Sequence, residues 1–93
     1  MSDEARGVFT IVNARGLHAR AATKLVQLAG RYACDITLTG PDGQQANGKS
    51  VMGVLLLCGS IGTVIEVQAR GSGARDAIDD IGRLIAARFG EPE

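Results

Sequence analysis

A chain of 93 residues is long enough for one domain with a modest apolar core, spanning residues 1–93. Hydrophobic residues make up 45% of it and charged residues 22%, a balance typical of a folded protein rather than a disordered one. The formal net charge is zero, and the aromatic residues are one Tyr and two Phe with no Trp. Nucleic-acid-binding surfaces need positive charge and stacking rings, so we expect no nucleic-acid partner.

Cysteine usage and hydropathy indicate a cytoplasmic protein. Cys34 and Cys58 lie far apart with no Cys-x-x-Cys spacing and no secretory leader before them. We therefore expect both to be small buried side chains in a reducing compartment. The longest apolar run, Val51 to Cys58, contains Gly53 and is far too short to cross a bilayer, so we expect no membrane insertion.

The first elements predicted are a strand and a helix. Met1–Arg6 is polar, and we expect it to be loose. The side chains of Val8–Val12 alternate, which predicts a strand with one covered face. A helix is predicted from about Ala19 to Ala29, with Gly30 as its stop. Its apolar stripe consists of Ala22, Leu25, Val26 and Ala29.

The middle of the chain changes to the period of strands. From Cys34 to Thr39 apolar and polar residues alternate, which predicts a half-buried strand. Gly40–Gly43 is a turn signal, and the short polar segment Gln44–Asn47 is expected to return as an edge strand. Ser50 is expected to cap a short helix with more apolar residues than one buried stripe needs. This helix carries Val51, Met52, Val54, Leu55 and Leu56.

The last part of the chain adds a strand and a helix. Thr63–Ala69 alternates as a strand, and Gly71–Gly73 separates it from a helix that Gly90 ends. The apolar positions of this helix are Ala77, Ile78, Ile81, Leu84, Ile85 and Phe89. The order βαββαβα predicts an α+β domain, a four-stranded antiparallel sheet with three helices on one face. Periodicity does not give strand order, so a ferredoxin-like arrangement stays open.

The only histidine, His18, stands between Arg15 and Arg20 where the first strand gives way to the first helix. Gly16 permits a tight bend, so we expect His18 at the cap or first turn of the helix. A helix N-terminus favours an anion, neutral imidazole is a nucleophile near pH 7, and an arginine fork suits phosphate oxygens. The pattern predicts a histidine that accepts a phosphoryl group.

Local charge supports an anionic substrate or an acidic partner. No acidic residue lies between Glu4 and Asp35, so we expect a basic surface around His18. The basic residues of this interval are Arg6, Arg15, Arg20, Lys24 and Arg31. The alternative is that His18 is an ordinary solvated or capping side chain. We expect no metal site, because His18 has no clustered ligand partner in the sequence.

Two motifs resemble one family. Gly16–Arg20, with the sequence GLHAR, resembles the active-site motif of HPr, the histidine-containing phosphocarrier of the bacterial phosphotransferase system. Gly48–Leu55, GKSVMGVL, resembles the region around that family's regulatory serine. The resemblance runs from Gly7 to Phe89 and implies the HPr-like open-faced β-sandwich. One departure is Ala21, where the family usually has proline.

The resemblance implies a phosphoryl carrier used stoichiometrically, not a stand-alone enzyme. Enzyme I, charged by phosphoenolpyruvate, would pass a phosphoryl group to Nδ1 of His18, and a sugar-specific or regulatory enzyme IIA would take it. Arg20 is expected to act beside His18, with Ala19, Ala21 and Arg15 supporting the phosphate. We expect no cofactor and a monomer.

Ser50 is expected to be a regulatory phosphorylation site, with HPr kinase/phosphorylase as a further partner. The alternative is that Ser50 is a helix cap and nothing more. The expected docking residues are Lys24, Lys49, Val51, Met52 and Leu55.

Two other functions stay open on the sequence. One is a regulatory carrier of the nitrogen type, whose phosphorylation reports metabolic state. The other is a non-catalytic module that binds a small anion or a partner helix, with His18 as an ordinary polar contact.

Overall fold

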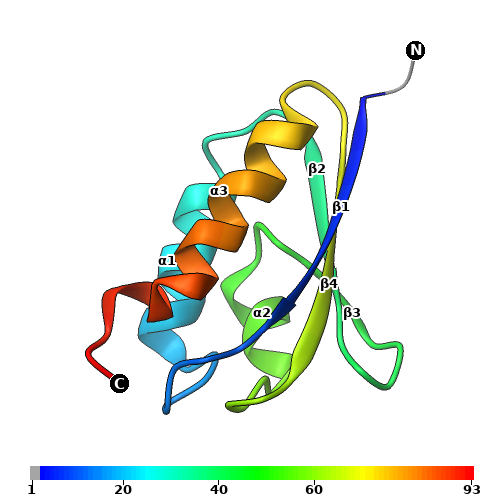
Figure 1. Ribbon diagram of the computed structural model, residues 1–93. Helices are drawn as coiled ribbons and strands as arrows, with labels where there is room; N and C mark the ends of the chain where they lie inside the picture. The colour runs from blue at the N-terminus through cyan, green and yellow to red at the C-terminus, as the bar shows by residue number, and fades with distance from the viewer. Residues whose placement is uncertain (1–2) are drawn as a thin grey trace.

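The protein has two layers, an antiparallel sheet and a set of helices that cover one of its faces (Figure 1). The computed structural model describes residues 3–93. Its strands are β1 (Glu4–Thr10), β2 (Asp35–Thr39), β3 (Gln45–Asn47) and β4 (Val64–Arg70). Its helices are α1 (Ala19–Ala29), α2 (Val51–Leu56), α3 (Ala74–Ala86) and the short 3₁₀ helix η1 (Arg88–Gly90). The predicted order and the α+β class are confirmed.

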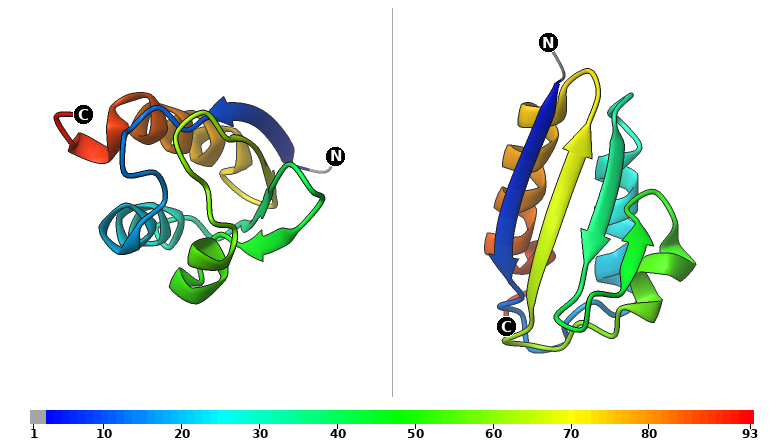
Figure 2. Two further views of the ribbon diagram at one scale, coloured as in Figure 1. Left: turned by 90° about the horizontal axis from the view of Figure 1, so that it is seen from below. Right: turned by 90° about the vertical axis from the view of Figure 1, so that its right-hand side faces the viewer.

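The strand order is β1-β4-β2-β3, with every neighbouring pair antiparallel. β4 lies in the interior of the sheet and pairs with β1 along the full length of both strands. β3 is a short edge strand, as predicted. With the sheet toward the viewer, all three α-helices lie behind it (Figure 2, right). The opposite face of the sheet is therefore open, as the alternation of polar residues predicts.

The first strand begins earlier than predicted. The prediction placed it at Val8–Val12 and expected Met1–Arg6 to be loose, whereas β1 already includes Glu4. The reason is its partner, because β4 extends to Arg70, which pairs with Glu4 in the ladder. The two side chains also form an ion pair with Nε and Oε1 2.8 Å apart. Residues 1 and 2 lie outside the described part of the chain.

The last helix ends before Phe89, contrary to the prediction. Arg88, Phe89 and Gly90 follow α3 with φ values of 59°, 54° and 79°, all in the left-handed region. Left-handed backbone costs about 1–2 kcal/mol for a residue with a side chain. Full burial of a large apolar side chain gains roughly 1.5–3 kcal/mol, and Phe89 is completely buried. The reversal turns the C-terminal segment back toward the start of α1.

The core fills the space between the sheet and the helices. Ala22, Leu25 and Ala29 of α1 are buried as predicted, whereas Val26 is only partly buried and Ala21 is buried in its place. The largest fully buried apolar side chains are Phe89, Ile11, Leu25, Leu38, Ile65, Ile81, Ile85, Val54 and Val67. No helix within residues 3–93 combines the length and the hydropathy that a bilayer crossing requires.

The cysteines differ from each other. Cys34 is buried, as predicted, but Cys58 is exposed and the prediction for it is wrong. Leu57 takes the buried position at the end of α2, and Cys58 follows it in a left-handed conformation with φ 50°. The side chain after the inward-facing leucine is thereby left at the surface.

A matched pair of glycines tests the packing of the loop before α1. A Cβ on Gly16, where φ is +63°, would lie 2.2 Å from the carbonyl oxygen of Gly59. Gly43 has φ +80° with nothing within 4 Å of its Cβ position. We expect Gly43→Ala to lose about 1–2 kcal/mol of unfolding free energy, and Gly16→Ala to lose a further 1–3 kcal/mol, roughly the cost of overpacking. Urea denaturation of both variants measures this, and equal losses would contradict the close backbone approach.

Candidate functional site

His18 closes the loop between β1 and α1 and is the N-cap residue of α1. Its backbone is extended, with φ −74° and ψ 178°, and its Nδ1 accepts the Arg20 amide at a donor–acceptor distance of 3.4 Å. The bend that places it there uses Gly16, whose N–H donates to the Asn13 carbonyl. The predicted position of His18 at the helix cap is therefore confirmed.

The first turn of α1 presents backbone donors beside the His18 ring. The Ala22 amide donates to the His18 carbonyl at 2.8 Å, which closes the first turn. The amides before it have no acceptor within the helix, and no acidic side chain stands in this turn. Ala21, where the resemblance expects proline, is fully buried. Its amide adds one donor that a proline would lack.

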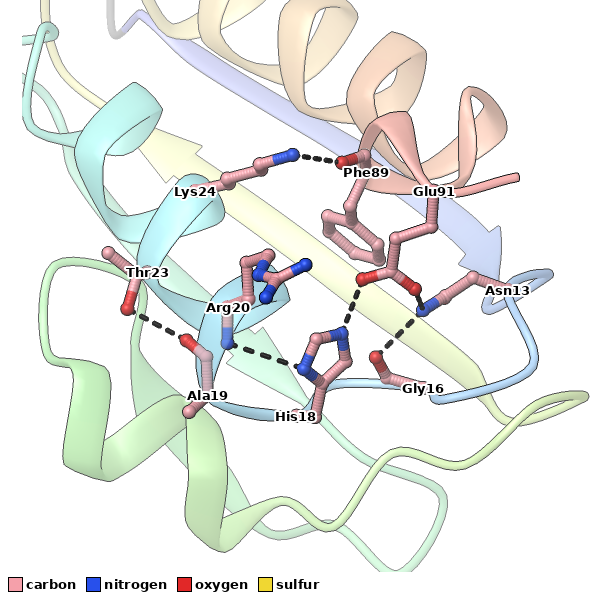
Figure 3. A network of polar contacts seen from close by, with 9 residues as sticks. All are labelled: Asn13, Gly16, His18, Ala19, Arg20, Thr23, Lys24, Phe89 and Glu91. Carbon is pink, nitrogen blue, oxygen red and sulfur yellow. Dashed lines mark hydrogen bonds and ion pairs between the residues drawn. The ribbon is translucent and has the colours of Figure 1, made fainter. Parts of the chain in front are cut away.

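The two arginines predicted at the site lie at the same shallow cavity. Arg15 and Arg20 line it together with the C-terminal residues Glu91, Pro92 and Glu93. Figure 3 shows the Arg20 side chain extending from the first turn of α1 toward the C-terminal segment. An anion bound beside His18 would lie within the field of both guanidinium groups.

Glu91 is a site residue that the sequence did not reveal. Its Oε2 contacts His18 Nε2, and its Oε1 accepts a hydrogen bond from Asn13 Nδ2 at 2.9 Å (Figure 3). The expectation of a basic surface around His18 therefore needs correction, because Glu91 and Glu93 bring negative charge to this end of the molecule. The glutamate stands 73 residues from His18 in sequence, so no local pattern connects the two.

The C-terminal segment is held against the His18 loop at several points. The Lys24 ammonium donates to the Phe89 carbonyl at 2.6 Å, and the Ala14 amide donates to the Glu93 carbonyl at 3.0 Å. Lys24, predicted as a docking residue, thus has a structural contact of its own. The lysine and the buried Phe89 ring together position Glu91.

Ser50 is the N-cap of α2, with Oγ accepting the Gly53 amide at 3.1 Å. Lys49 is exposed, and its ammonium donates to the Tyr32 carbonyl at 2.6 Å. Of the expected apolar docking residues, Met52 is 68% exposed. The other two, Val51 and Leu55, pack partly against the core, while Leu56, 72% exposed, was not among them. The surface patch of α2 is therefore formed by Met52 and Leu56.

Comparison with known proteins identifies the class of protein to which this chain belongs. Residues 5–87 match the family model described as the PTS HPr component phosphorylation site, so the chain is a phosphocarrier of the phosphotransferase system. The phosphocarrier protein HPr of Cupriavidus necator is 43% identical over 84 residues, which cover 90% of this chain and 93% of that protein.

A solved structure agrees with the sequence match. The crystal structure of HPr from Thermoanaerobacter tengcongensis superposes with a TM-score of 0.91 at 35% identity, covering 96% of this chain and 99% of that one. The chain belongs to the HPr family, and the expected HPr-like open-faced sandwich is confirmed. A further relative, the phosphocarrier protein NPr of Shewanella violacea, is 42% identical over 82 residues, which cover 88% of this chain and 89% of that protein.

The Glu91 carboxylate gives the fold a pH dependence. The hydrogen bond from His18, followed by that from Asn13, lowers the pKa of Glu91, while partial burial acts in the opposite direction. A lowered folded-state pKa stabilises the protein above the unfolded-state value, about 4.3. This contribution is lost as the pH falls through the lower folded-state pKa. We expect the wild type to be more stable than Glu91→Gln at pH 7, and the difference to close toward pH 3.

Urea denaturation of both proteins across this pH range measures the difference. Glu93→Gln is the matched control, since it removes a charge from the same segment and leaves the contact with His18. A stability difference between the wild type and Glu91→Gln that persists unchanged to pH 3 would contradict the assignment.

Proposed function

We propose that His18 is the residue that carries the phosphoryl group, on Nδ1, that enzyme I supplies the group and that an enzyme IIA accepts it. The observation that carries the proposal is the position of Nδ1 at the N-cap of α1, where it faces the Arg20 amide. An added phosphoryl group would meet backbone donors and the positive end of the helix. The HPr family assignment supports the same chemistry.

Phosphoryl transfer to His18 forms one bond and breaks another. The Nδ1 lone pair forms a bond to phosphorus, and the bond from phosphorus to the donor breaks with its electron pair staying on the donor. Arg15 and Arg20 and the first amides of α1 offset the charge that arrives. Each hydrogen bond to a charged group contributes on the order of 1.5–3 kcal/mol. Hydrogen bonds of this strength hold the phosphoryl group firmly enough to carry it and weakly enough to release it.

A regulatory carrier of the nitrogen type is the second candidate. The similarity to the NPr protein of Shewanella violacea favours it. The GKSVMGVL block around Ser50 and the HPr relatives favour the sugar-system carrier, which we place first. Phosphotransfer from this protein to purified sugar-specific and nitrogen-type enzyme IIA separates the two candidates.

Replacement of the single histidine tests whether His18 is the residue that accepts the phosphoryl group. Incubation with enzyme I and labelled phosphoenolpyruvate is expected to give the wild type an acid-labile, base-stable label and His18→Ala none. His18 is only half-buried, so the variant should keep its helical circular dichroism. Acid-labile label on His18→Ala would overturn the assignment, because the chain has no other histidine.

Arg20→Lys is the graded variant of the same experiment. It keeps the charge and the backbone amide but lacks the planar fork of a guanidinium. We expect it to accept label more slowly than the wild type. Transfer at the wild-type rate would assign the phosphate contact to Arg15 and the amides.

We also propose that Ser50 is a regulatory phosphorylation site read by an HPr kinase/phosphorylase. Its position at the start of α2 supports this, because the backbone amides at a helix start donate hydrogen bonds to phosphate oxygens. The exposed side chains of Met52 and Leu56 lie on the helix that Ser50 caps. A dianion there would add desolvation cost to docking and repel an acidic partner.

Two Ser50 variants separate regulation from capping. Ser50→Asp is expected to weaken binding to enzyme I while keeping the helical circular dichroism. Ser50→Ala is expected to lose about 1 kcal/mol of unfolding free energy with the cap, and to bind enzyme I normally. Titration calorimetry measures both affinities. Equal binding by the two variants and the wild type would leave Ser50 as a cap alone.

A further inference from the structure

We propose that Glu91 is a positioning residue for phosphoryl transfer: its carboxylate holds the ring proton of His18 on Nε2 and leaves Nδ1 unprotonated, as the ring nitrogen that can bond to phosphorus. The inference rests on the proposed role of His18. It assigns a task to a residue outside the matched family range, which ends at residue 87.

Two contacts define one tautomer of the His18 ring. Nε2 contacts the Glu91 carboxylate, which can only accept, and Nδ1 receives the Arg20 amide, which can only donate. A neutral imidazole carries one proton, so both contacts are satisfied only when that proton is on Nε2. The lowered pKa of Glu91 agrees, since it keeps the carboxylate ionised at neutral pH.

The carboxylate that makes this contact is itself fixed. Its side chain is only 11% exposed, and Asn13 donates to its second oxygen. Asn13 is fully buried, and the same Nδ2 also donates to the Gly16 carbonyl at 2.9 Å. Its Oδ1 has no partner among the described residues, a costly arrangement for a buried amide. The role of the buried Asn13 side chain is therefore carried by its Nδ2 group, whose two hydrogen bonds join the C-terminal segment to the His18 loop.

The contact serves both directions of transfer without moving a proton. When Nδ1 bonds to phosphorus, the ring keeps its Nε2 proton and becomes a cation, which the Glu91 carboxylate faces and stabilises. When the N–P bond breaks, its electron pair returns to Nδ1 and the ring is neutral again with the same Nε2 proton. A cationic ring is the better leaving group, so Glu91 keeps the phosphoryl group transferable. The carboxylate also repels a phosphoryl anion from Nε2.

The first test measures the tautomer of the His18 ring directly. Because the chain has a single histidine, ¹⁵N NMR of ring-labelled protein reports one imidazole. We expect the neutral ring of the wild type to be almost entirely the Nε2–H tautomer, and that of Glu91→Ala to move toward the mixture of free imidazole. Glu93→Ala is the control, because the contact of Glu93 with Ala14 uses its backbone carbonyl. We expect it to match the wild type.

The second readout uses phosphoramidate, a small phosphoryl donor that needs no enzyme. In ³¹P NMR we expect the wild type and Glu93→Ala to form only Nδ1-phosphohistidine, and Glu91→Ala to form the Nε2 isomer as well. We also expect severalfold slower transfer from phosphorylated Glu91→Ala to enzyme IIA. A Glu91→Ala protein with the wild-type tautomer ratio and only the Nδ1 product would overturn the inference.

Failure of the proposed function has a different signature. In that case the wild type takes no label from enzyme I, while the tautomer and phosphoramidate results still distinguish Glu91→Ala from Glu93→Ala. Circular dichroism of all three proteins checks that they are folded alike.

Discussion

The requirement that helices α1 and α3 bury their apolar stripes on the same face of one sheet governs the structure. Both helices lie on that face, and the start of α1 and the end of α3 come to the same end of the molecule (Figure 1). The loop that carries His18 and the chain that leaves α3 therefore meet. A site made from the loop between β1 and α1 and the C-terminal segment therefore follows from how the two helices cover the core.

Much of the fold could be predicted because it depends on local period. Alternation predicted β1, β2 and β4, and a turn signal predicted β3. Helix α1 begins and ends at the predicted residues, Ala19 and Ala29. The start of β1 could not be predicted in this way, since Glu4 is ordered by its pairing with Arg70 on a distant strand. The end of α3 was missed because the burial of Phe89 outweighs the backbone preference of the residues around it.

In the candidate site, too, the parts that depend on local sequence could be predicted and the part that depends on a distant contact could not. His18 at a helix cap and Ser50 at another follow from residues within a few positions of each. Glu91 depends on a left-handed reversal and on a buried Asn13, neither of which leaves a pattern in sequence. Its contact with the ring shows that a surface judged basic from one stretch of chain can receive its acidic group from another.

The close approach of Gly16 to Gly59 fixes the position of the His18 loop relative to α2. The Leu17 amide donates to the Gly59 carbonyl at 2.7 Å, so the His18 loop is tied by backbone to the segment that follows α2. A protein that binds the exposed side chains of Met52 and Leu56 would thus meet His18 already held at a fixed position relative to α2. With no loop to order at each encounter, little conformational entropy is lost on docking. If the protein carries a phosphoryl group between two partners as proposed, this rigidity speeds exchange without tight binding to either partner.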